Sequence, residues 1–310
     1  EVTREYARLL KLKAELATIG EILLPVEVAL LKEVSAEVIK NQKSANKNLK
    51  FYKEALVDFN TNAKLLTDQG GLRTIDFDSL EAYDPTTPEL AKAKEKIIDL
   101  MNRGLEPENI NSEIEYYDVQ ANFYYNKNLT TRAEVVGDDQ SNPNEKSYGN
   151  NNVIGPDAFH GTHVAGIIAA NRENTIGING VAKKVKIMAL RAVPNGDERD
   201  KDIANSIRYA VDNGAKVINM SFGKSYSPSK DVVDAAVKYA EEKGVLLIHA
   251  AGNSYSDNDK GGNFPNRTML TDKSEVNNWL EIGGSSFNND SSFAAGFSNY
   301  GKKTVDIFAP

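Results

Sequence analysis

The first part of the chain carries apolar side chains at helical spacing. In residues 1–20 they recur every three or four positions, which predicts an amphipathic helix interrupted by Gly20 and Pro25. A longer helix is predicted from about residue 26 to 67. Part of it alternates steps of four and three, a heptad-like pattern suited to packing against a partner helix. The residues of this seam are Ala45, Leu49, Tyr52, Leu56, Phe59, Ala63 and Leu66.

Two further helices are predicted before residue 130. Thr87 is a suitable N-cap, Pro88 suits the first helical position, and the apolar pattern then runs from Leu90 to Met101. A weaker pattern predicts a fourth helix from Glu113 to Tyr125. Long helices with polar outer faces and no catalytic constellation predict an all-helical module over residues 1–130. This module is either a structural insertion or a device that binds a partner or controls substrate access.

The pattern changes near residue 130. Residues 138–152 are rich in Asp, Asn, Ser, Gly and Pro, which predicts a loop. After residue 170, short apolar strands alternate with amphipathic helices, as is typical of a parallel sheet covered on both faces. Residues 131–310 are therefore predicted to be α/β, a doubly wound parallel sheet. The predicted strands are Val185–Val193, Ala215–Met220, Val245–Ala250, Trp279–Ile282 and Thr304–Phe308, and the predicted helices are Lys201–Asn213 and Ser229–Lys243.

Composition excludes several classes of protein. The 310 residues are 40% apolar and 26% charged, which is ordinary for a globular protein. The net charge of −7 argues against a general nucleic-acid binder, and the absence of cysteine excludes disulfides and thiolate metal sites. No apolar run approaches the length of a membrane span, and no signal peptide is visible at the start. The chain begins without Met and ends on Phe-Ala-Pro, so both ends are expected to be cut.

Candidate chemistry begins with the segment His-Gly-Thr-His-Val-Ala-Gly, which starts at His160 and continues to Ala170. Gly161, Ala165 and Ala169 lie four residues apart, on one helical face that lets a helix approach its neighbours closely. His160 then lies in the first turn, where a histidine is firmly aimed and can act as a general base near neutral pH. The alternative is a packed core helix that contains two histidines.

Two predicted strand ends add to this picture. Ligands of open α/β sheets collect beyond the carboxyl ends of the strands. One end runs from Ile218 to Gly223 and the other from His249 to Ser254. Each alone could be an ordinary exit from strand to loop. Together with the His160 segment, they occur in the order found in the subtilisin-like serine proteases, and residues 130–310 closely resemble this family, the subtilases.

The resemblance implies a serine endopeptidase that hydrolyses polypeptide substrates with a Ser-His-Asp triad. His160 matches the triad histidine, which takes the proton from the nucleophilic serine and returns it to the leaving amine. His163 is expected to be structural. Asn253 matches the asparagine that donates a hydrogen bond to the oxyanion. Secretion or a cell-envelope location is implied by the resemblance alone.

The resemblance also implies a set of substrate-binding residues. One segment matches the strand that pairs with the substrate backbone, and a second matches a wall of the primary specificity pocket. Asn263 falls where the family closes the floor of this pocket. His249 lies within a continuous apolar strand and is expected to be a core histidine. The substrate-pairing residues are Ser221, Phe222 and Gly223, and the pocket-wall residues are Ala250, Ala251 and Gly252.

Two members of the triad are missing from the pattern. No Asp-Ser-Gly or Asp-Thr-Gly precedes His160, and Asp138 and Asp139 run on into a loop sequence. The nucleophile string Gly-Thr-Ser-Met-Ala is absent, and the serines at 221, 285, 286, 291 and 292 lack its context. We therefore interpret residues 131–310 as an incomplete subtilisin-like domain and residues 1–130 as a helical insertion between its acid and base segments. The acid is expected before residue 1 and the serine after residue 310, so the fragment alone should be inactive.

Other functions stay open at this stage. A catalytically inactive subtilase-like protein could bind peptides or a partner in the same groove. A metal hydrolase using His160 and His163 is less well supported, because His-x-x-His lacks the glutamate and the spacing of His-Glu-x-x-His. The triad chemistry requires no cofactor. The loop 171–178 resembles a subtilase calcium loop and is a candidate structural calcium site, but Glu173 is its only carboxylate.

Overall fold

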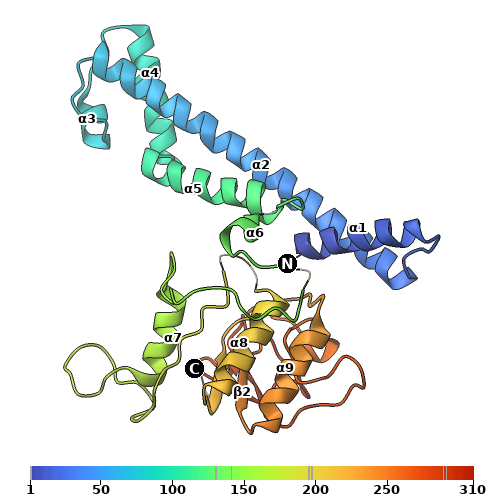
Figure 1. Ribbon diagram of the computed structural model, residues 1–310. Helices are drawn as coiled ribbons and strands as arrows, with labels where there is room; N and C mark the ends of the chain where they lie inside the picture. Colours follow the sequence, from blue (N-terminus) through green and yellow to red (C-terminus); the bar gives the residue numbers. More distant parts are fainter. Residues whose placement is uncertain are drawn as a thin grey trace. The chain divides into compact units, whose positions relative to one another are not determined.

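The computed structural model describes residues 2–129, 131–140, 142–194, 196, 198–288, 290 and 292–310. The chain divides into two compact units, Val2–Leu129 and Thr130–Pro310, and Figure 1 labels their helices α1–α9 and the strand β2. The first unit is built from helices. They are α1 (Val2–Thr18), α2 (Pro25–Asp68), α3 (Phe77–Ala82), α4 (Pro88–Asn102) and α5 (Pro107–Val119), which continues as a π-helical turn, Gln120–Tyr124.

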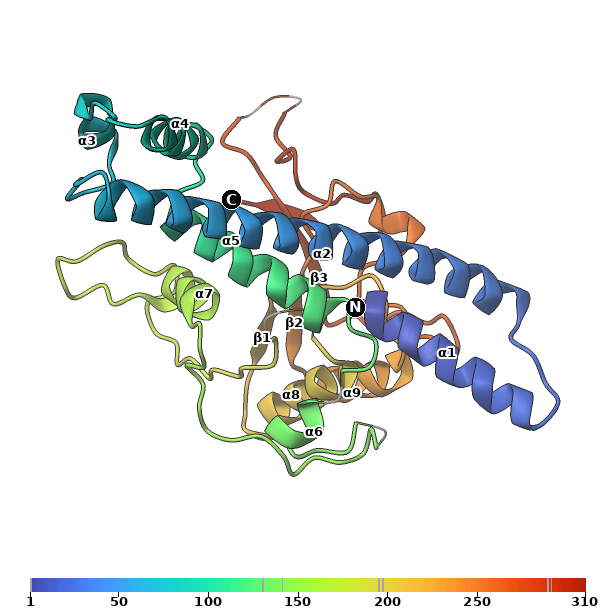
Figure 2. The same ribbon diagram turned by 90° about the horizontal axis from the view of Figure 1, so that it is seen from above.

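The apolar seam of the long helix is its packing face. Within the helical unit, α2 packs along α5 and α4 (Figure 2). All seven seam residues lie in the two apolar clusters that these helices share. The buried members of the seam are Ala45, Leu49, Phe59 and Leu66, and its partly buried members are Tyr52, Leu56 and Ala63. The predicted partner-helix packing is therefore confirmed, and the partners come from the same unit.

Local signals set the start of two helices in this unit. The Thr87 hydroxyl accepts a hydrogen bond from the Leu90 N–H at 3.3 Å, as expected of an N-cap before Pro88. The short helix α3 is not predicted by the pattern. Its start is set by the carboxylate of Asp76, which accepts from the Ser79 N–H at 2.8 Å. A single cap and one turn are too short to produce a periodic signal.

The second unit contains a four-stranded parallel sheet in the order β1-β2-β3-β4, and Figure 2 shows β1, β2 and β3 side by side. The predicted α/β class with a parallel sheet is confirmed. The strands are β1 (Val217–Met220), β2 (Leu246–Ala250), β3 (Trp279–Gly284) and β4 (Ile307–Ala309). The helices are α6 (Thr131–Val135), α7 (Phe159–Ala169), α8 (Asp200–Asp212) and α9 (Lys230–Glu242), with a 3₁₀ turn, Asn258–Lys260.

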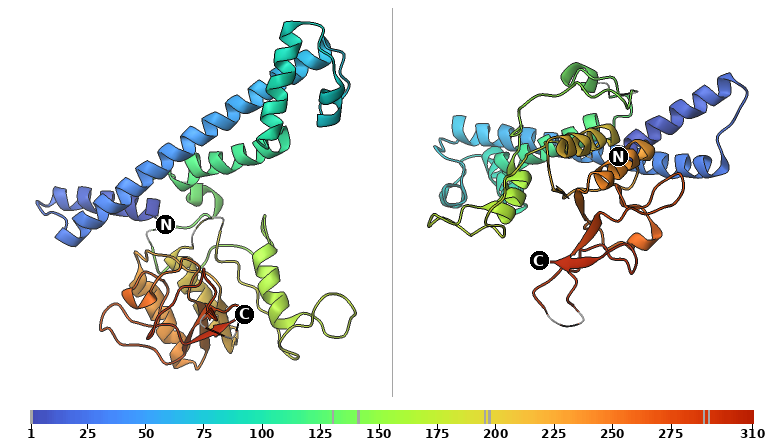
Figure 3. Two further views of the ribbon diagram at one scale, coloured as in Figure 1. Left: turned by 180° about the vertical axis from the view of Figure 1, so that it is seen from behind. Right: turned by 60° about the horizontal axis from the view of Figure 1, so that its bottom comes forward.

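One face of this sheet carries the core of the unit. Helices α8 and α9 lie side by side (Figure 3), and their apolar stripes pack on Met220, Leu247 and Trp279. Burial alternates along β2 and β3 as the pleat requires. Residues of the opposite face, such as Ile248 and Ile282, are only half-buried. The sheet is therefore covered unequally on its two faces.

One predicted strand is wrong. No strand forms at Val185–Val193, and the side chains of Val185 and Ile187 are 51% and 49% exposed. A β-strand forms only when its backbone N–H and C=O groups find a neighbouring strand. In the described part of the chain, β1 has a paired neighbour on one side only, and Val217 at its start is 54% exposed. The apolar run 185–193 therefore has the composition of a strand without a strand beside it.

Candidate active site

The carboxyl ends of β1 and β2 bring two of the predicted segments together. The strands are parallel, and Met220 pairs in register with His249. Ser221–Gly223 and Ala251–Asn253 therefore leave the sheet at the same edge, from neighbouring strands. This is the position at which open α/β sheets bind their ligands.

Asn263 ties these two segments to each other. Its side-chain amide donates to the carbonyl oxygens of Ala250 and Ala251, both at 3.0 Å. These bonds turn its Oδ1 toward Gly223, where a Cβ atom would lie 2.5 Å from that oxygen. Only glycine fits at position 223. The predicted pocket walls and Asn263 thus form one connected cluster.

A buried hydrogen-bonded pair, His249 and Glu281, lies directly beneath this cluster. The Nδ1 atom of His249 is 3.0 Å from Glu281 Oε2, and both side chains are almost completely buried. Glu281 also accepts hydrogen bonds from Trp279 Nε1 at 2.9 Å and from Asn263 Nδ2 at 2.9 Å. Because these two partners donate, the carboxylate is satisfied as an acceptor, and His249 Nδ1–H completes the set. His249 is therefore a buried core histidine, and its Nε2 has no hydrogen-bond partner among the described residues.

Sequence reasoning missed Glu281, although a signal was present. The residue stands in the middle of an apolar strand, and an isolated carboxylate is very costly to bury without partners. A charged residue at a core position of a strand therefore predicts a polar network around it. The partners themselves, His249 and Asn263, come from other parts of the chain and could not be paired with it in advance.

The structure leaves Asn253 free to donate a hydrogen bond. The residue is exposed, and its side-chain amide has no hydrogen-bond partner among the described residues. It follows Gly252, whose φ of +105° belongs to the region that favours glycine. The free amide lies just beyond the end of β2, next to the cluster around Asn263.

His160 occupies the first turn of α7 but is not joined to the strand ends. Its side chain is exposed and has no hydrogen-bond or ion-pair partner within the described ranges. His163 stacks on Phe159, with ring centroids 6.2 Å apart. No residue of α7 is buried, and open space lies beside Gly161. The small-residue face is therefore present, but the close packing expected of it is not formed.

Asp138 forms part of a buried ionic network and makes no hydrogen bond to His160. Its carboxylate accepts from Arg132 and from Lys201, each at 2.8 Å. Arg132 also binds Asp202 of α8 at 2.7 Å, and Lys201 binds Glu145 at 2.7 Å. Burial pushes the pKa of Asp138 upward, but the hydrogen bonds and charges of Arg132 and Lys201 outweigh it and lower the pKa from 3.8 to about 2. Asp138 thus anchors its loop to α8.

We expect Asp138→Asn to lower the free energy of unfolding of this unit by about 3 kcal/mol at pH 7, because buried cations lose their partner. Since the folded-state pKa lies below the unfolded value, this stabilisation is complete above about pH 5 and is lost as the pH falls toward 2. The difference from the unmodified protein should shrink by about 1 kcal/mol between pH 6 and pH 3.

Urea unfolding followed by the fluorescence of Trp279, the single tryptophan, measures this effect in the second unit. Lys238→Gln is the matched control, because it breaks an exposed ion pair with Asp272 and should change the free energy by less than about 1 kcal/mol. Equal effects of the two substitutions, or a difference that does not change with pH, would contradict the role given to Asp138.

None of the serines that the structure describes makes a hydrogen bond to a histidine. No described serine is therefore placed as a nucleophile beside a general base. Ser221 Oγ accepts from Asn219 Nδ2 at 2.8 Å, and Ser286 Oγ donates to the Ser292 carbonyl at 2.7 Å. Ser285 follows β3 and makes no such contact with a histidine. Ser291 lies outside the described residues.

The described residues contain no group of three or more His, Asp or Glu side chains that could hold a metal ion. In the loop 171–178, the side-chain oxygens of Asn171 and Asn174 accept from the N–H groups of Glu173 and Ile176. These oxygens therefore close local turns, and the loop supplies one carboxylate where calcium usually takes several. The described side chains of this loop therefore supply few free oxygen atoms of the kind that calcium takes.

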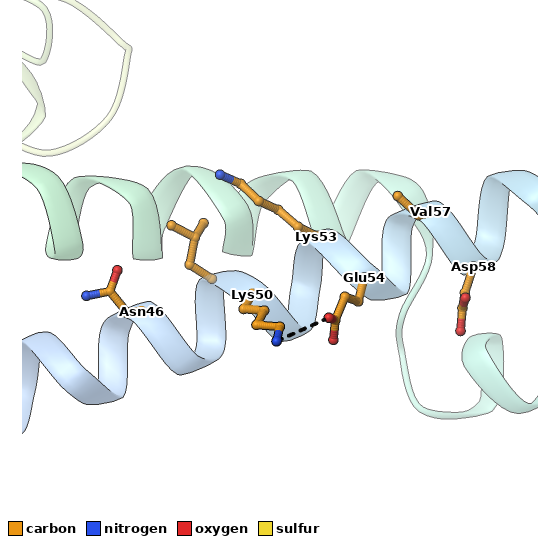
Figure 4. A pocket seen from close by; sticks show the side chains of 7 residues that line it. Asn46, Lys50, Lys53, Glu54, Val57 and Asp58 are labelled. Carbon is orange, nitrogen blue, oxygen red and sulfur yellow. Dashed lines mark ion pairs between the residues drawn. The ribbon is translucent and has the colours of Figure 1, made fainter.

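A shallow hollow lies on α2 in the helical unit (Figure 4). Its charged side chains are paired and exposed, so each pair contributes little free energy. The pairs are Lys50–Glu54 at 3.8 Å, Lys53–Asp118 at 3.8 Å and Lys96–Asp58 at 3.4 Å. The hollow is lined by Asn46, Leu49, Lys50, Lys53, Glu54, Val57 and Asp58. We assign no site to it.

None of the described helices is both long and apolar enough to cross a membrane.

Comparisons with known proteins all find similarity to the subtilase family or to proteases. Residues 72–310 match the model of the subtilase family. The chain is 38% identical over 152 residues to thermitase of Thermoactinomyces vulgaris, which covers 49% of this chain and 48% of thermitase. It is 36% identical over 182 residues to a cell wall-associated protease of Bacillus subtilis (strain 168), covering 58% of this chain and 18% of that protein.

Among solved structures, a cold adapted subtilisin-like serine proteinase is 31% identical, with a TM-score of 0.38 over 49% of this chain and 48% of that one. The chain thus spans about half of thermitase and a smaller part of the cell wall-associated protease. The family match begins inside the helical unit, within the turn that follows α2, and extends to the end of the chain.

Proposed function

Because the chain belongs to the subtilase family, we propose that it supplies the general base and the oxyanion donor of a serine endopeptidase. The observation that supports this proposal is the parallel pairing of β1 and β2, because the segments Ser221–Gly223 and Ala251–Asn253 then leave the sheet at the same edge and Asn253 is exposed. A substrate in extended conformation would add to that segment, with its scissile carbonyl near Asn253. The substrates are polypeptides.

The proposed roles follow from the chemistry of each group. His160 takes the proton of the attacking serine and passes it to the leaving amine. Asn253 donates to the oxygen on which negative charge develops, and its amide stays available because it has no hydrogen-bond partner among the described residues. Ala250, Ala251 and Gly252 form one wall of the primary specificity pocket, and their small side chains leave room for a large substrate side chain. Asn263 joins this wall to Gly223 at the floor.

The acid and the nucleophile are assigned to parts of the protein outside residues 1–310. Asp138 is committed to Arg132 and Lys201, and the string Gly-Thr-Ser-Met-Ala does not occur in the chain. In this proposal the helical unit Val2–Leu129 is an insertion between the acid and base segments. The similarity to a cell wall-associated protease of Bacillus subtilis also supports an extracellular or cell-envelope location as part of the proposal.

Residues 1–310 alone are expected to be unreactive toward a fluorophosphonate probe, which labels only activated serines, and toward peptide substrates. A base and an oxyanion donor without the nucleophile cannot form an acyl-enzyme. The test uses the purified chain, with thermitase, to which the chain is 38% identical over 152 residues, as the positive control. Stoichiometric labelling of the 310-residue chain that disappears in His160→Ala would place the nucleophile inside it and refute this assignment.

A further inference from the structure

The loop that carries Asn253 is held by a buried side chain from a distant part of the chain. Asn299 lies between β3 and β4, and its side chain is almost completely buried. Its Oδ1 accepts hydrogen bonds from the N–H groups of Ser254 at 2.9 Å and Ser256 at 3.0 Å. Its Nδ2 donates to the Ala251 carbonyl at 2.8 Å. One carboxamide thus binds the backbone on both sides of Asn253.

Two further contacts bring the same residue against the peptide that precedes Asn253. The backbone N–H of Asn299 donates to the Gly252 carbonyl at 2.8 Å. A Cβ atom at position 252 would lie only 2.6 Å from Asn299 Nδ2. Gly252 has φ +105° and Tyr255 has φ +50°, so this loop holds uncommon backbone conformations that need external support. Asn299 supplies that support from the loop before β4.

Asn253 itself makes no side-chain hydrogen bond with the described residues, so the direction of its amide depends on the backbone around it. We propose that Asn299 is a positioning residue that aims Asn253 at the oxyanion. The inference rests on the proposed function, because it assigns Asn299 a role through the oxyanion donor. Misplacing a catalytic group by about 1 Å can lower a rate by about 10²-fold.

Loss of the Asn299 side chain should loosen this loop without unfolding the unit. The Ala251 carbonyl also accepts from Asn258 Nδ2 at 2.8 Å and Asn263 Nδ2 at 3.0 Å, so the end of β2 keeps its partners. The N–H groups of Ser254 and Ser256 would lose their acceptor, and the buried Asn258 Oδ1 would lose the Asn299 donor at 3.1 Å. Ser254 and Ser256 are exposed, and water can replace their acceptor. Loss of the Asn299 side chain is therefore expected to change the conformation of the Asn253 loop more than the free energy of unfolding.

The kinetic test uses the longer, active protein. Asn299→Ala is expected to lower kcat by about 10- to 100-fold and to change KM by less than about twofold. In a protein that already carries Asn253→Ala, the same substitution should lower kcat by less than about twofold, because the group it positions is gone. Asn278→Ala is the matched control. It removes an amide bond to the Val245 carbonyl, at the opposite end of β2, and should leave kcat nearly unchanged.

Each kinetic outcome decides a different claim. Full additivity of Asn299→Ala and Asn253→Ala, or a kcat loss equal to that of Asn278→Ala, would overturn the positioning role while leaving the proposed function intact. A normal kcat in Asn253→Ala alone would overturn both.

Amide hydrogen exchange supplies a measurement that does not need activity. In Asn299→Ala, the amides of Ser254 and Ser256 should exchange at least about tenfold faster, and in Asn278→Ala they should not change. Asn299→Asp keeps an acceptor for these two N–H groups but loses the donor to Ala251, so their protection should largely return. Unchanged exchange in Asn299→Ala would show that the side chain does not hold the loop and would overturn the inference.

Discussion

On the proposed function, His160→Ala is expected to lower kcat by about 10⁶-fold, with the fold intact, in a protein that joins residues 1–310 to the triad acid and serine. This figure is the loss reported for the triad histidine of a subtilisin, a member of the same family. Without the imidazole, no group accepts the serine proton during attack or returns it to the leaving amine. The side chain is exposed on α7 and has no hydrogen-bond or ion-pair partner among the described residues, so its removal leaves no polar group unpaired.

The matched control is His163→Ala on the same helix, which removes a ring stacked on Phe159 and should leave kcat within about tenfold of normal. Fluorescence of Trp279 checks that each variant keeps the core of the second unit. Near-normal turnover in a folded His160→Ala protein would eliminate His160 as the base. Equal losses in both histidine variants would indicate that α7 matters for its structure alone.

Asn253→Ala is expected to lower kcat by about 10²–10³-fold and to leave KM nearly unchanged. A hydrogen bond to a developing oxyanion strengthens in the transition state, so its loss appears in kcat and corresponds to about 2.7–4 kcal/mol. The magnitude comes from the equivalent asparagine of a subtilisin. Steady-state kinetics on a peptide substrate measure both constants.

The control for this prediction is Asn213→Ala. Asn213 is an exposed asparagine whose amide donates to Tyr209 at the end of α8, away from the strand ends. Its loss should change neither kinetic constant. An effect of Asn253→Ala that falls mainly on KM would mean that the amide binds the ground state of the substrate, and the oxyanion assignment would then be wrong.

Local periodicity predicted the elements that carry their own pattern. The seam on α2 repeats at heptad spacing, so its burial against α4 and α5 follows from residues close together in sequence. The strands β1, β2 and β3 are short apolar runs bounded by polar loops, and they form where predicted. The run 185–193 has the same composition, yet it is not a strand, because strand formation depends on a neighbour that composition does not encode.

The sequence by itself determined the family, the α/β class and the candidate residues His160 and Asn253, because these depend on short strings and local spacing. Tertiary structure alone decided which distant groups meet. It paired Asp138 with Arg132 and Lys201, and Glu281 with His249. It also brought Asn299 to the loop of Asn253. Buried polar groups must find partners, but these partners become neighbours only when the chain folds. Nothing in the local sequence identifies which residues they will be.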